Sequence, residues 1–117
     1  MREPTDITGY HAHVYFDVAA RDAAARVREG LAQRFTVELG RWHDQPVGPH
    51  TKAMYQVAFA PDQFARVVPW LMLNREGLSI LVHPCTGDEV QDHDTNPLWL
   101  GDRLRINVEF LRQHAGS

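Results

Sequence analysis

The sequence predicts an α+β fold in which one sheet carries helices on a single face. Segments with alternating apolar and polar residues, typical of half-buried strands, are separated by segments with apolar residues at helical spacing. Along the chain these segments give the order βαββαβ. The chain has 117 residues, which suits one compact core, so residues 1–117 are treated as a single domain.

The first strand is predicted over residues 8–17. One of its faces packs on a core and the other is available for function, because successive side chains of a strand point to opposite faces. An alanine-rich helix follows over residues 19–33, since alanine is the best helix former and apolar residues recur there at helical spacing. The alternating sets of the strand are Tyr10, Ala12, Val14 and Phe16, which are apolar, and His11, His13, Tyr15 and Asp17, which are polar.

The rest of the chain repeats this pattern. A second strand over 35–40 leads into a loop over 41–50, and a third strand is predicted over 53–60. A second helix begins at Pro61 and ends near Gly77, and Pro69 is expected to kink it or to divide it into two short helices. A fourth strand over 78–82 is followed by a long polar loop over 84–103 and by a last strand over 105–111.

This order is that of the ferredoxin-like fold, which contains a split βαβ unit. We expect a βαββαβ sandwich with an antiparallel sheet in the strand order 4-1-3-2, except that strands one and three run parallel. Helices on one face leave the other face uncovered. A second copy of the chain is therefore expected to cover it, forming a homodimer with the character of a dimeric α+β barrel.

The composition excludes several functional classes. A net charge of −3 and a pI near 6.1 argue against nucleic acid as a partner. The single cysteine, Cys85, cannot form an internal disulfide and fits a reducing compartment. Neither a signal-peptide core nor an apolar run of bilayer length occurs, so we expect a cytoplasmic protein that does not bind a membrane. Nucleotide-binding glycine motifs, a Gly-x-Ser-x-Gly elbow and a zinc-binding cysteine pair are not found in the sequence.

Four histidines are expected to meet at one end of the sheet. His11 and His13 share a face because they lie two residues apart on a strand. The expected strand directions place the start of strand one beside the start of strand three and the end of strand four, which carry His50 and His83. Neutral imidazole is the commonest protein ligand for a transition metal. This sheet mouth is therefore a candidate metal site, and the alternative is a polar dimer interface in which the histidines bond backbone carbonyls.

Glu89 and His93 follow within reach of that mouth. Glu89 would complete a triad of two histidines and one carboxylate, which suits non-haem Fe(II) and leaves positions open. His93 would act as an acid or a base near neutral pH. The alternative for both is a solvated loop. Three neighbouring acids are interpreted as solvated charges, namely Asp88, Asp92 and Asp94.

Aromatic residues near these loops are candidates for substrate contact. Trp42 and Trp99 flank the loops, and Tyr15 lies beside the histidines on the first strand. Tyr55 could also stack on a ring, but it is equally consistent with ordinary core. Cys85 is interpreted as a small apolar filler. Basic residues that could pair with a substrate carboxylate are more simply read as solvated, and these are Arg41, Lys52 and Arg75.

Four segments contain the histidines in distinctive surroundings: Tyr-His-Ala-His-Val-Tyr-Phe, Val-Gly-Pro-His-Thr, Leu-Ser-Ile-Leu-Val-His-Pro-Cys-Thr-Gly and Asp-His-Asp-Thr-Asn-Pro-Leu-Trp-Leu-Gly. Together these segments resemble the DOPA 4,5-dioxygenase family, and the resemblance runs from about Thr8 to Asn107. It implies a small dimerising ferredoxin-like protein that opens a catechol ring beside its hydroxyls, using dioxygen and non-haem iron. By resemblance, the histidine positions of the family are matched by His11, His13, His50, His83 and His93.

The leading hypothesis is therefore an Fe(II)-dependent extradiol dioxygenase acting on a catechol such as L-DOPA. We expect the metal ligands to be His13, His50, His83 and Glu89, the catalytic residues to be His93 and His11, and the substrate contacts to be Trp42, Tyr15 and Trp99. The alternative is a non-catalytic dimeric module that binds a metal or a small aromatic ligand on the open sheet face. An open coordination position that faces an aromatic-lined pocket would distinguish the enzyme from the module.

Overall fold

One five-stranded sheet organises the molecule, with the strand order β2-β3-β1-β4-β5. The computed structural model describes residues 1–114. The first four strands lie in the predicted 4-1-3-2 order, so the α+β class and the ferredoxin-like strand order are confirmed. The strands are Gly9–Tyr15 (β1), Glu38–Leu39 (β2), Met54–Phe59 (β3), Ile80–Cys85 (β4) and Leu98–Leu100 (β5).

Every pair of neighbouring strands in this sheet runs antiparallel. Tyr10 is opposite Phe59 and Tyr15 is opposite Met54, so β1 and β3 point in opposite directions. The prediction that strands one and three are parallel is therefore wrong. Each long helix returns the chain to a strand two positions away and parallel to the one before the helix. The strand between them must then run the other way.

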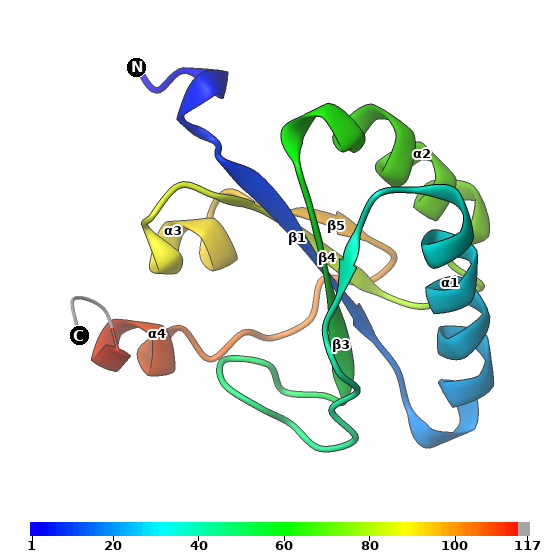
Figure 1. Cartoon of the computed structure of the whole chain (residues 1–117). Coiled ribbons are helices and arrows are strands. Elements are labelled where there is room, and N and C mark those ends of the chain that lie inside the picture. The colour runs from blue at the N-terminus through cyan, green and yellow to red at the C-terminus, as the bar shows by residue number, and fades with distance from the viewer. Residues whose placement is uncertain (115–117) are drawn as a thin grey trace.

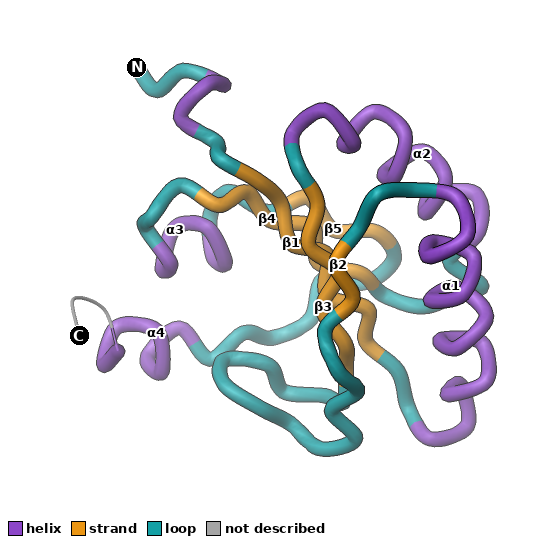
Figure 2. The backbone as a smooth tube through the Cα atoms, in the orientation of Figure 1, coloured by secondary structure: helices purple, strands orange, loops and turns teal. Residues whose placement is uncertain are grey.

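Two helices cover one face of the sheet, α1 (Arg21–Arg34) and α2 (Phe64–Asn74), as Figures 1 and 2 show. Short 3-10 turns precede them at Val18–Ala20 and Pro61–Gln63, and a third such turn lies at Pro4–Asp6. The apolar set of β1 faces these helices, as its alternation predicted. The main core is formed by this set together with buried residues that include Val27, Leu31, Val57, Val67, Leu71 and Ile80.

The helix α2 continues through Pro69 as one element, so the predicted division into two short helices is wrong. Pro69 is exposed, whereas Val67, Val68 and Leu71 are buried against the sheet. A proline inside a helix removes one backbone hydrogen bond. Here the apolar stripe of α2 holds the helix against the sheet on both sides of that position.

The opposite face of the sheet is covered by later parts of the same chain. The helices α3 (Glu89–Asp94) and α4 (Val108–His114) lie on the side away from α1 and α2 (Figure 1). A second, smaller apolar cluster lies on this face, where Tyr15, Met54 and Leu81 pack with Trp99 and Ile106. The face that was expected to be open in one chain is therefore partly covered without a second copy.

Two predictions about the C-terminal part are wrong. Residues 84–103 contain α3 and β5 in place of a continuous loop, because Asp88 caps α3 by accepting from the Gln91 amide, and β5 adds to the sheet beside β4. Residues 105–111 do not form a strand: Asn107 accepts a hydrogen bond from the Phe110 amide, and α4 begins after it. No helix within residues 1–114 has the length and apolar character needed to span a bilayer.

Candidate metal centre

The strand β1 presents two histidines on the face away from α1 and α2. His11 and His13 alternate with Ala12 and Val14, which are fully buried in the main core. On the neighbouring strand β4, His83 lies directly opposite His11. These three imidazoles share one face of the sheet, as the alternation predicted.

Two further histidines reach the same face from outside the strands. His93 lies in α3, and His50 lies in the loop before β3, where its backbone pairs with Ile106. The His50 ring centroid is 4.2 Å from that of His13, and the His93 centroid is 4.0 Å from that of His83. The predicted convergence is therefore confirmed.

The predicted place of this convergence is wrong. The histidines were expected at the mouth of the sheet, where parallel strands one and three would begin together. Because β1 and β3 are antiparallel, the start of β3 lies beside the end of β1. His50 reaches the cluster because its loop returns over the sheet face and pairs with residue 106.

The ring nitrogens of the five histidines lie at distances that suit metal ligation. They fall into two groups, His11–His13–His83 and His13–His50–His93, and within each group the nitrogens lie within 4.8 Å of one another. His13 belongs to both groups. The Nε2 atoms of His13 and His83 are 3.1 Å apart. This buried cluster can hold a metal ion.

Backbone carbonyls fix the orientation of two of the rings. The His83 Nδ1 lies 2.9 Å from the Pro84 carbonyl, and the His93 Nδ1 lies 2.8 Å from the Glu89 carbonyl. A carbonyl oxygen only accepts, so each Nδ1 carries the hydrogen and donates it. Each Nε2 then carries a lone pair that can bind a metal or accept a proton. Such outer hydrogen bonds are typical of metal-binding histidines.

His50 is held by a side chain rather than by the backbone. Its Nδ1 lies 2.7 Å from the Tyr15 hydroxyl, and both residues are buried. The Tyr15 ring is stacked on Trp99 at a centroid distance of 6.0 Å and an interplanar angle of 17°. Tyr15 therefore links β1, β5 and the loop that carries His50.

Burial lowers the pKa of several histidines of the cluster. Desolvation, followed by the neighbouring His93, lowers the pKa of His50 to about 4 and that of His83 to about 3. Burial, followed by the surrounding histidines, also places the pKa of His13 well below its usual value. The pKa of His11 is lowered by burial to a smaller extent, opposed by the charge of Glu89. Neutral imidazoles retain the lone pairs that metal ligation requires.

One buried polar atom in the cluster tests whether these residues fit a metal. The His13 Nδ1 is buried and has no hydrogen-bond partner within the described part of the chain. Leaving such an atom unpartnered costs about 1–3 kcal/mol. One ring nitrogen of His13 is thus left unsatisfied by the described residues, and the all-imidazole donor set of the cluster suits iron, zinc, copper or nickel.

The structure does not bring Glu89 into either group of candidate ligands. Its carboxylate is exposed and lies 3.6 Å from the His93 Nδ1. Its backbone carbonyl, in contrast, orients His93. The role that the geometry supports for Glu89 is to hold His93.

The three predicted aromatic contacts are divided between the two faces of the sheet. Tyr15 and Trp99 lie on the histidine side. Trp42 packs in the helix-side core, with ring centroids 5.3 Å from Phe16 and 5.0 Å from Tyr55. That packing does not support Trp42 as a substrate contact.

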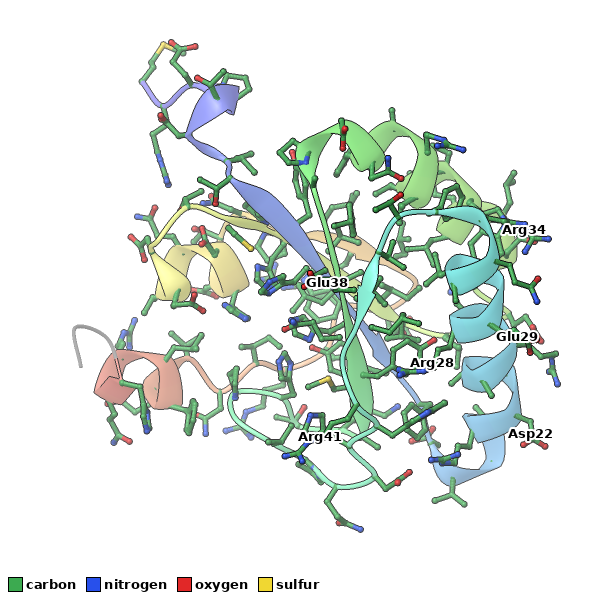
Figure 3. All side chains as sticks on the ribbon, viewed as in Figure 1. Asp22, Arg28, Glu29, Arg34, Glu38 and Arg41 are labelled. Atoms are coloured by element: carbon green, nitrogen blue, oxygen red, sulfur yellow. The ribbon has the colours of Figure 1, made fainter. Side chains whose placement is uncertain are left out.

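An arginine reinforces the packing of Trp42. Arg28 points from α1 toward the sheet, whereas Asp22 and Glu29 of the same helix point away from it (Figure 3). The Arg28 guanidinium lies over Trp42, 5.3 Å from the ring centroid, and over Tyr55 at 5.0 Å. Such cation–π contacts add to core packing.

The structure gives no role in substrate binding to the three basic residues that could pair with a substrate carboxylate. Lys52 forms an ion pair with Asp17 at 3.1 Å, and Arg75 donates to the Leu78 carbonyl at 2.9 Å. Arg41 is exposed on the loop after β2 (Figure 3). Burial, then the charge of Asp92, raises the pKa of the Cys85 thiol to about 11, which agrees with its interpretation as an unreactive filler.

Sequence reasoning missed one buried acid beside the cluster. Asp92 was interpreted as a solvated loop charge, but it is only 1% exposed. It accepts hydrogen bonds from the amide and the hydroxyl of Thr86, at 2.8 and 2.6 Å. This pair closes the turn between β4 and α3 and so positions His93, which follows Asp92 directly. The only sequence feature that could have indicated this contact is the presence of a hydrogen-bonding threonine six residues before the aspartate.

Two pockets adjoin the histidine cluster. The larger, of about 620 Å³, borders His11 at the start of β1, and its lining includes Glu38, Asp62 and Cys85. The smaller, of about 140 Å³, borders His93 and includes Trp99, Arg103, Leu104, Arg105 and Ile106 in its lining. Reactants can therefore approach the cluster from two sides.

Known proteins resemble this chain over most of its length. A DOPA 4,5-dioxygenase from Amanita muscaria is 34% identical over 117 residues, and an uncharacterised 21.2 kDa protein from Botryotinia fuckeliana is 35% identical over 123 residues. The alignments cover 92% and 97% of this chain but only 51% and 66% of those proteins. The chain thus spans about half to two thirds of the length of these curated relatives.

A solved structure is similar to this chain at a higher sequence identity. The crystal structure of a candidate dioxygenase from Nostoc punctiforme is 67% identical and superimposes with a TM-score of 0.97, covering 97% of this chain and 99% of that one. The sequence profile of the Dopa 4,5-dioxygenase family matches residues 10–110, a range that contains all five clustered histidines. This chain belongs to the DOPA 4,5-dioxygenase family.

Proposed function

We propose that this chain is a non-haem Fe(II)-dependent extradiol dioxygenase that opens the ring of a catechol such as L-DOPA. The observation that carries the proposal is the cluster of five histidines, four of them buried, with ring nitrogens at ligand distances beside a pocket lined by Trp99. Membership of the family supports the dioxygenase class. An aromatic-lined pocket that reaches the cluster favours the enzyme over the non-catalytic binding module.

His13 and His83 are the ligands that the geometry supports best. Their Nε2 atoms lie 3.1 Å apart, close to the roughly 3 Å expected between adjacent nitrogen ligands that bind one ion at about 2.1 Å. His11 completes their distance group. In this proposal His11, His13 and His83 hold the ion, whereas His50 and Glu89, which were expected as ligands, support the chemistry from outside.

Bound Fe(II) would supply a Lewis acid that lowers the pKa of a catechol hydroxyl and gathers the two reactants at one centre. His93 is the proposed base. Its Nδ1 donates to the Glu89 carbonyl, so its Nε2 lone pair can take a catechol proton and later return it. His50, held by Tyr15, is the second proposed proton-transfer group. Burial of both rings excludes bulk water from these transfers.

Reconstitution tests the proposal. The protein is loaded anaerobically with Fe(II), mixed with a panel of catechols that includes L-DOPA, and exposed to oxygen. We expect one dioxygen consumed per catechol and a yellow ring-opened product. His83→Ala should abolish both signals, while His43→Ala, a histidine outside both ligand groups, should retain them. A protein that holds stoichiometric iron but consumes no oxygen with any catechol would refute the proposal.

The cellular setting is part of the same proposal. Iron must remain ferrous to bind dioxygen, and the single unpaired Cys85 fits a reducing compartment. We therefore propose a cytoplasmic enzyme whose partners are its aromatic substrate, dioxygen and a second copy of the chain.

A further inference from the structure

The pocket beside His93 has the size of a single aromatic ring. Its volume is about 140 Å³, and cavities of roughly 150 Å³ are known to hold one benzene molecule. Trp99 and Ile106 supply apolar wall, and both belong to the apolar cluster on the histidine side of the sheet. A catechol ring placed here would lie next to the proposed base.

Two arginines give this pocket an excess of positive charge. Arg103 and Arg105 line it together with one acid, Asp94. Within residues 1–114 neither guanidinium takes part in an ion pair. Arg103 makes one long contact of 3.5 Å, from Nη2 to the Asp94 backbone carbonyl. Two guanidinium groups in one pocket are thus left without a carboxylate partner from the protein.

The backbone holds one of these arginines in place. The Arg105 carbonyl accepts a hydrogen bond of 2.8 Å from the Thr51 hydroxyl, and the next residue, Ile106, pairs with His50. The segment that carries Arg105 is therefore fixed to the loop that carries a histidine of the cluster. The backbone from which the Arg105 side chain extends thus keeps a defined position relative to that cluster.

The larger pocket on the other side of the cluster has the opposite charge. Its lining contains Glu38 and Asp62 but no lysine or arginine. A substrate carboxylate would be repelled there and attracted at the smaller pocket. The charge difference between the two pockets would therefore favour an anionic tail directed toward the smaller one.

We propose that Arg103 and Arg105 form a carboxylate-binding subsite that makes the enzyme selective for catechols with an anionic tail. This inference rests on the proposed function, whose substrate class it narrows. Guanidinium groups bind a carboxylate through paired N–H donors, which fixes the orientation of the tail as well as adding affinity. With the carboxylate held at the pocket rim, the ring lies against Trp99 with its hydroxyls toward His93.

The test compares three catechols whose ring substituent differs in charge: 3,4-dihydroxybenzoate, which carries a carboxylate, catechol itself, which carries no substituent, and 4-(aminomethyl)catechol, which carries an ammonium group. Each is titrated anaerobically into the iron-loaded protein, and the Kd is measured by calorimetry. We expect the carboxylate to bind about tenfold more tightly than catechol and the amine to bind more weakly. The double variant Arg103→Gln/Arg105→Gln should lose this preference, so that its Kd values for 3,4-dihydroxybenzoate and catechol become similar.

The control is Arg26→Gln, which removes one positive charge from α1 on the other face of the sheet, as each single arginine variant does at the pocket, and it should keep the preference. Circular dichroism checks folding, and each single variant should lose part of the preference if the double variant does not fold. A double variant that still prefers the carboxylate, or a parent protein with equal affinity for all three probes, would overturn the inference. If the enzyme turns over catechols but shows no preference for charge, the arginine subsite is refuted and the proposed reaction stands. If the carboxylate binds through the arginines but no catechol is turned over, the proposed reaction is refuted and the subsite stands.

Discussion

Two buried tyrosines allow the role of one hydrogen bond in the cluster to be isolated. The Tyr15 and Tyr55 side chains are 2% and 0% exposed, and each hydroxyl makes one hydrogen bond of 2.7 Å. The Tyr15 hydroxyl bonds the His50 Nδ1, whereas the Tyr55 hydroxyl donates to the Ala24 carbonyl on the helix side. Tyr15→Phe and Tyr55→Phe thus remove the same atom from two environments of similar burial.

Both variants should lose a similar amount of stability. Loss of one buried hydrogen bond costs about 1 kcal/mol, and up to about 3 kcal/mol when the remaining partner stays buried and unsatisfied. Only Tyr15→Phe releases the His50 ring. If His50 transfers a proton, its misplacement should lower kcat by about tenfold or more, because a positioned acid or base contributes roughly 100-fold to 10,000-fold. Iron content should not change in either variant, since His50 lies outside the proposed ligand group.

Three measurements on the same samples decide this prediction. Urea unfolding gives the stability, metal analysis gives the iron content, and oxygen uptake with saturating catechol gives kcat for the folded fraction. The reasoning is refuted if kcat falls equally in both variants, or if Tyr15→Phe turns over as fast as the parent protein. Loss of iron in Tyr15→Phe alone would instead identify His50 as a ligand and overturn the proposed ligand group.

Three further predictions concern the metal, the pH dependence and the assembly. His13→Ala and His83→Ala should each abolish iron binding with an unchanged circular dichroism spectrum, whereas His50→Ala should retain iron; full iron occupancy in the first two variants would exclude them as ligands. Burial lowers the pKa of His50 to about 4 and that of His83 to about 3, while an unfolded histidine titrates near 6.5, so the unfolded chain binds more protons in that interval. The free energy of unfolding of the metal-free protein should therefore be greatest above about pH 6.5 and should fall as the pH falls toward 4. The loss should be roughly 3 kcal/mol for His50 alone. A urea midpoint that stays constant from pH 7 to 5 would contradict this prediction. Light scattering after size-exclusion chromatography should give twice the 13.4 kDa of one chain; a mass of one chain would mean that α3, β5 and the 101–107 segment alone complete the site.

The parts of the fold that follow from local periodicity were predictable from the sequence. The alternation in β1 assigned Ala12, Val14 and Phe16 to the helix-side core and His11 and His13 to the other face, and both assignments are confirmed. Strand direction is a property of the whole topology rather than of any segment. The residue pattern of β3 does not indicate its direction relative to β1, and the prediction that the two strands are parallel was wrong.

The C-terminal errors have a common physical cause. Residues 105–111 alternate as a strand would, yet a single side-chain hydrogen bond at Asn107 directs the chain into α4. Similarly, the Asp88 cap starts α3 within a stretch whose polarity predicted a loop. Short elements of this kind are decided by caps and by neighbours in space, which outweigh periodicity over six or seven residues.

In the candidate site, too, the features set by strand alternation were predictable, whereas the contacts between residues far apart in the sequence were not. The shared face of His11, His13 and His83 was predictable because strands β1 and β4 carry all three. The supporting contacts were not, since Tyr15 meets His50 across 35 positions and Arg105 meets Thr51 across 54. Each of these contacts joins the C-terminal covering segment or β1 to the loop before β3. Tyr15, which holds the proposed proton-transfer group His50, is thus brought to it only by the tertiary structure, whereas Glu89 orients His93 from within the same helix.

Under the proposed function, that arrangement would place the metal ligands on fixed strands and the substrate contacts on the segments that cover them. The three proposed ligands stand on central strands, where the paired backbone fixes them. The proposed proton-transfer groups and the two pocket arginines stand on covering segments held by a few side-chain bonds, such as those of Thr86 to Asp92 and of Thr51 to residue 105. Substitutions in the covering segments can therefore change substrate charge preference without altering the ligand set. Substitutions on β1 and β4 would alter the metal centre itself.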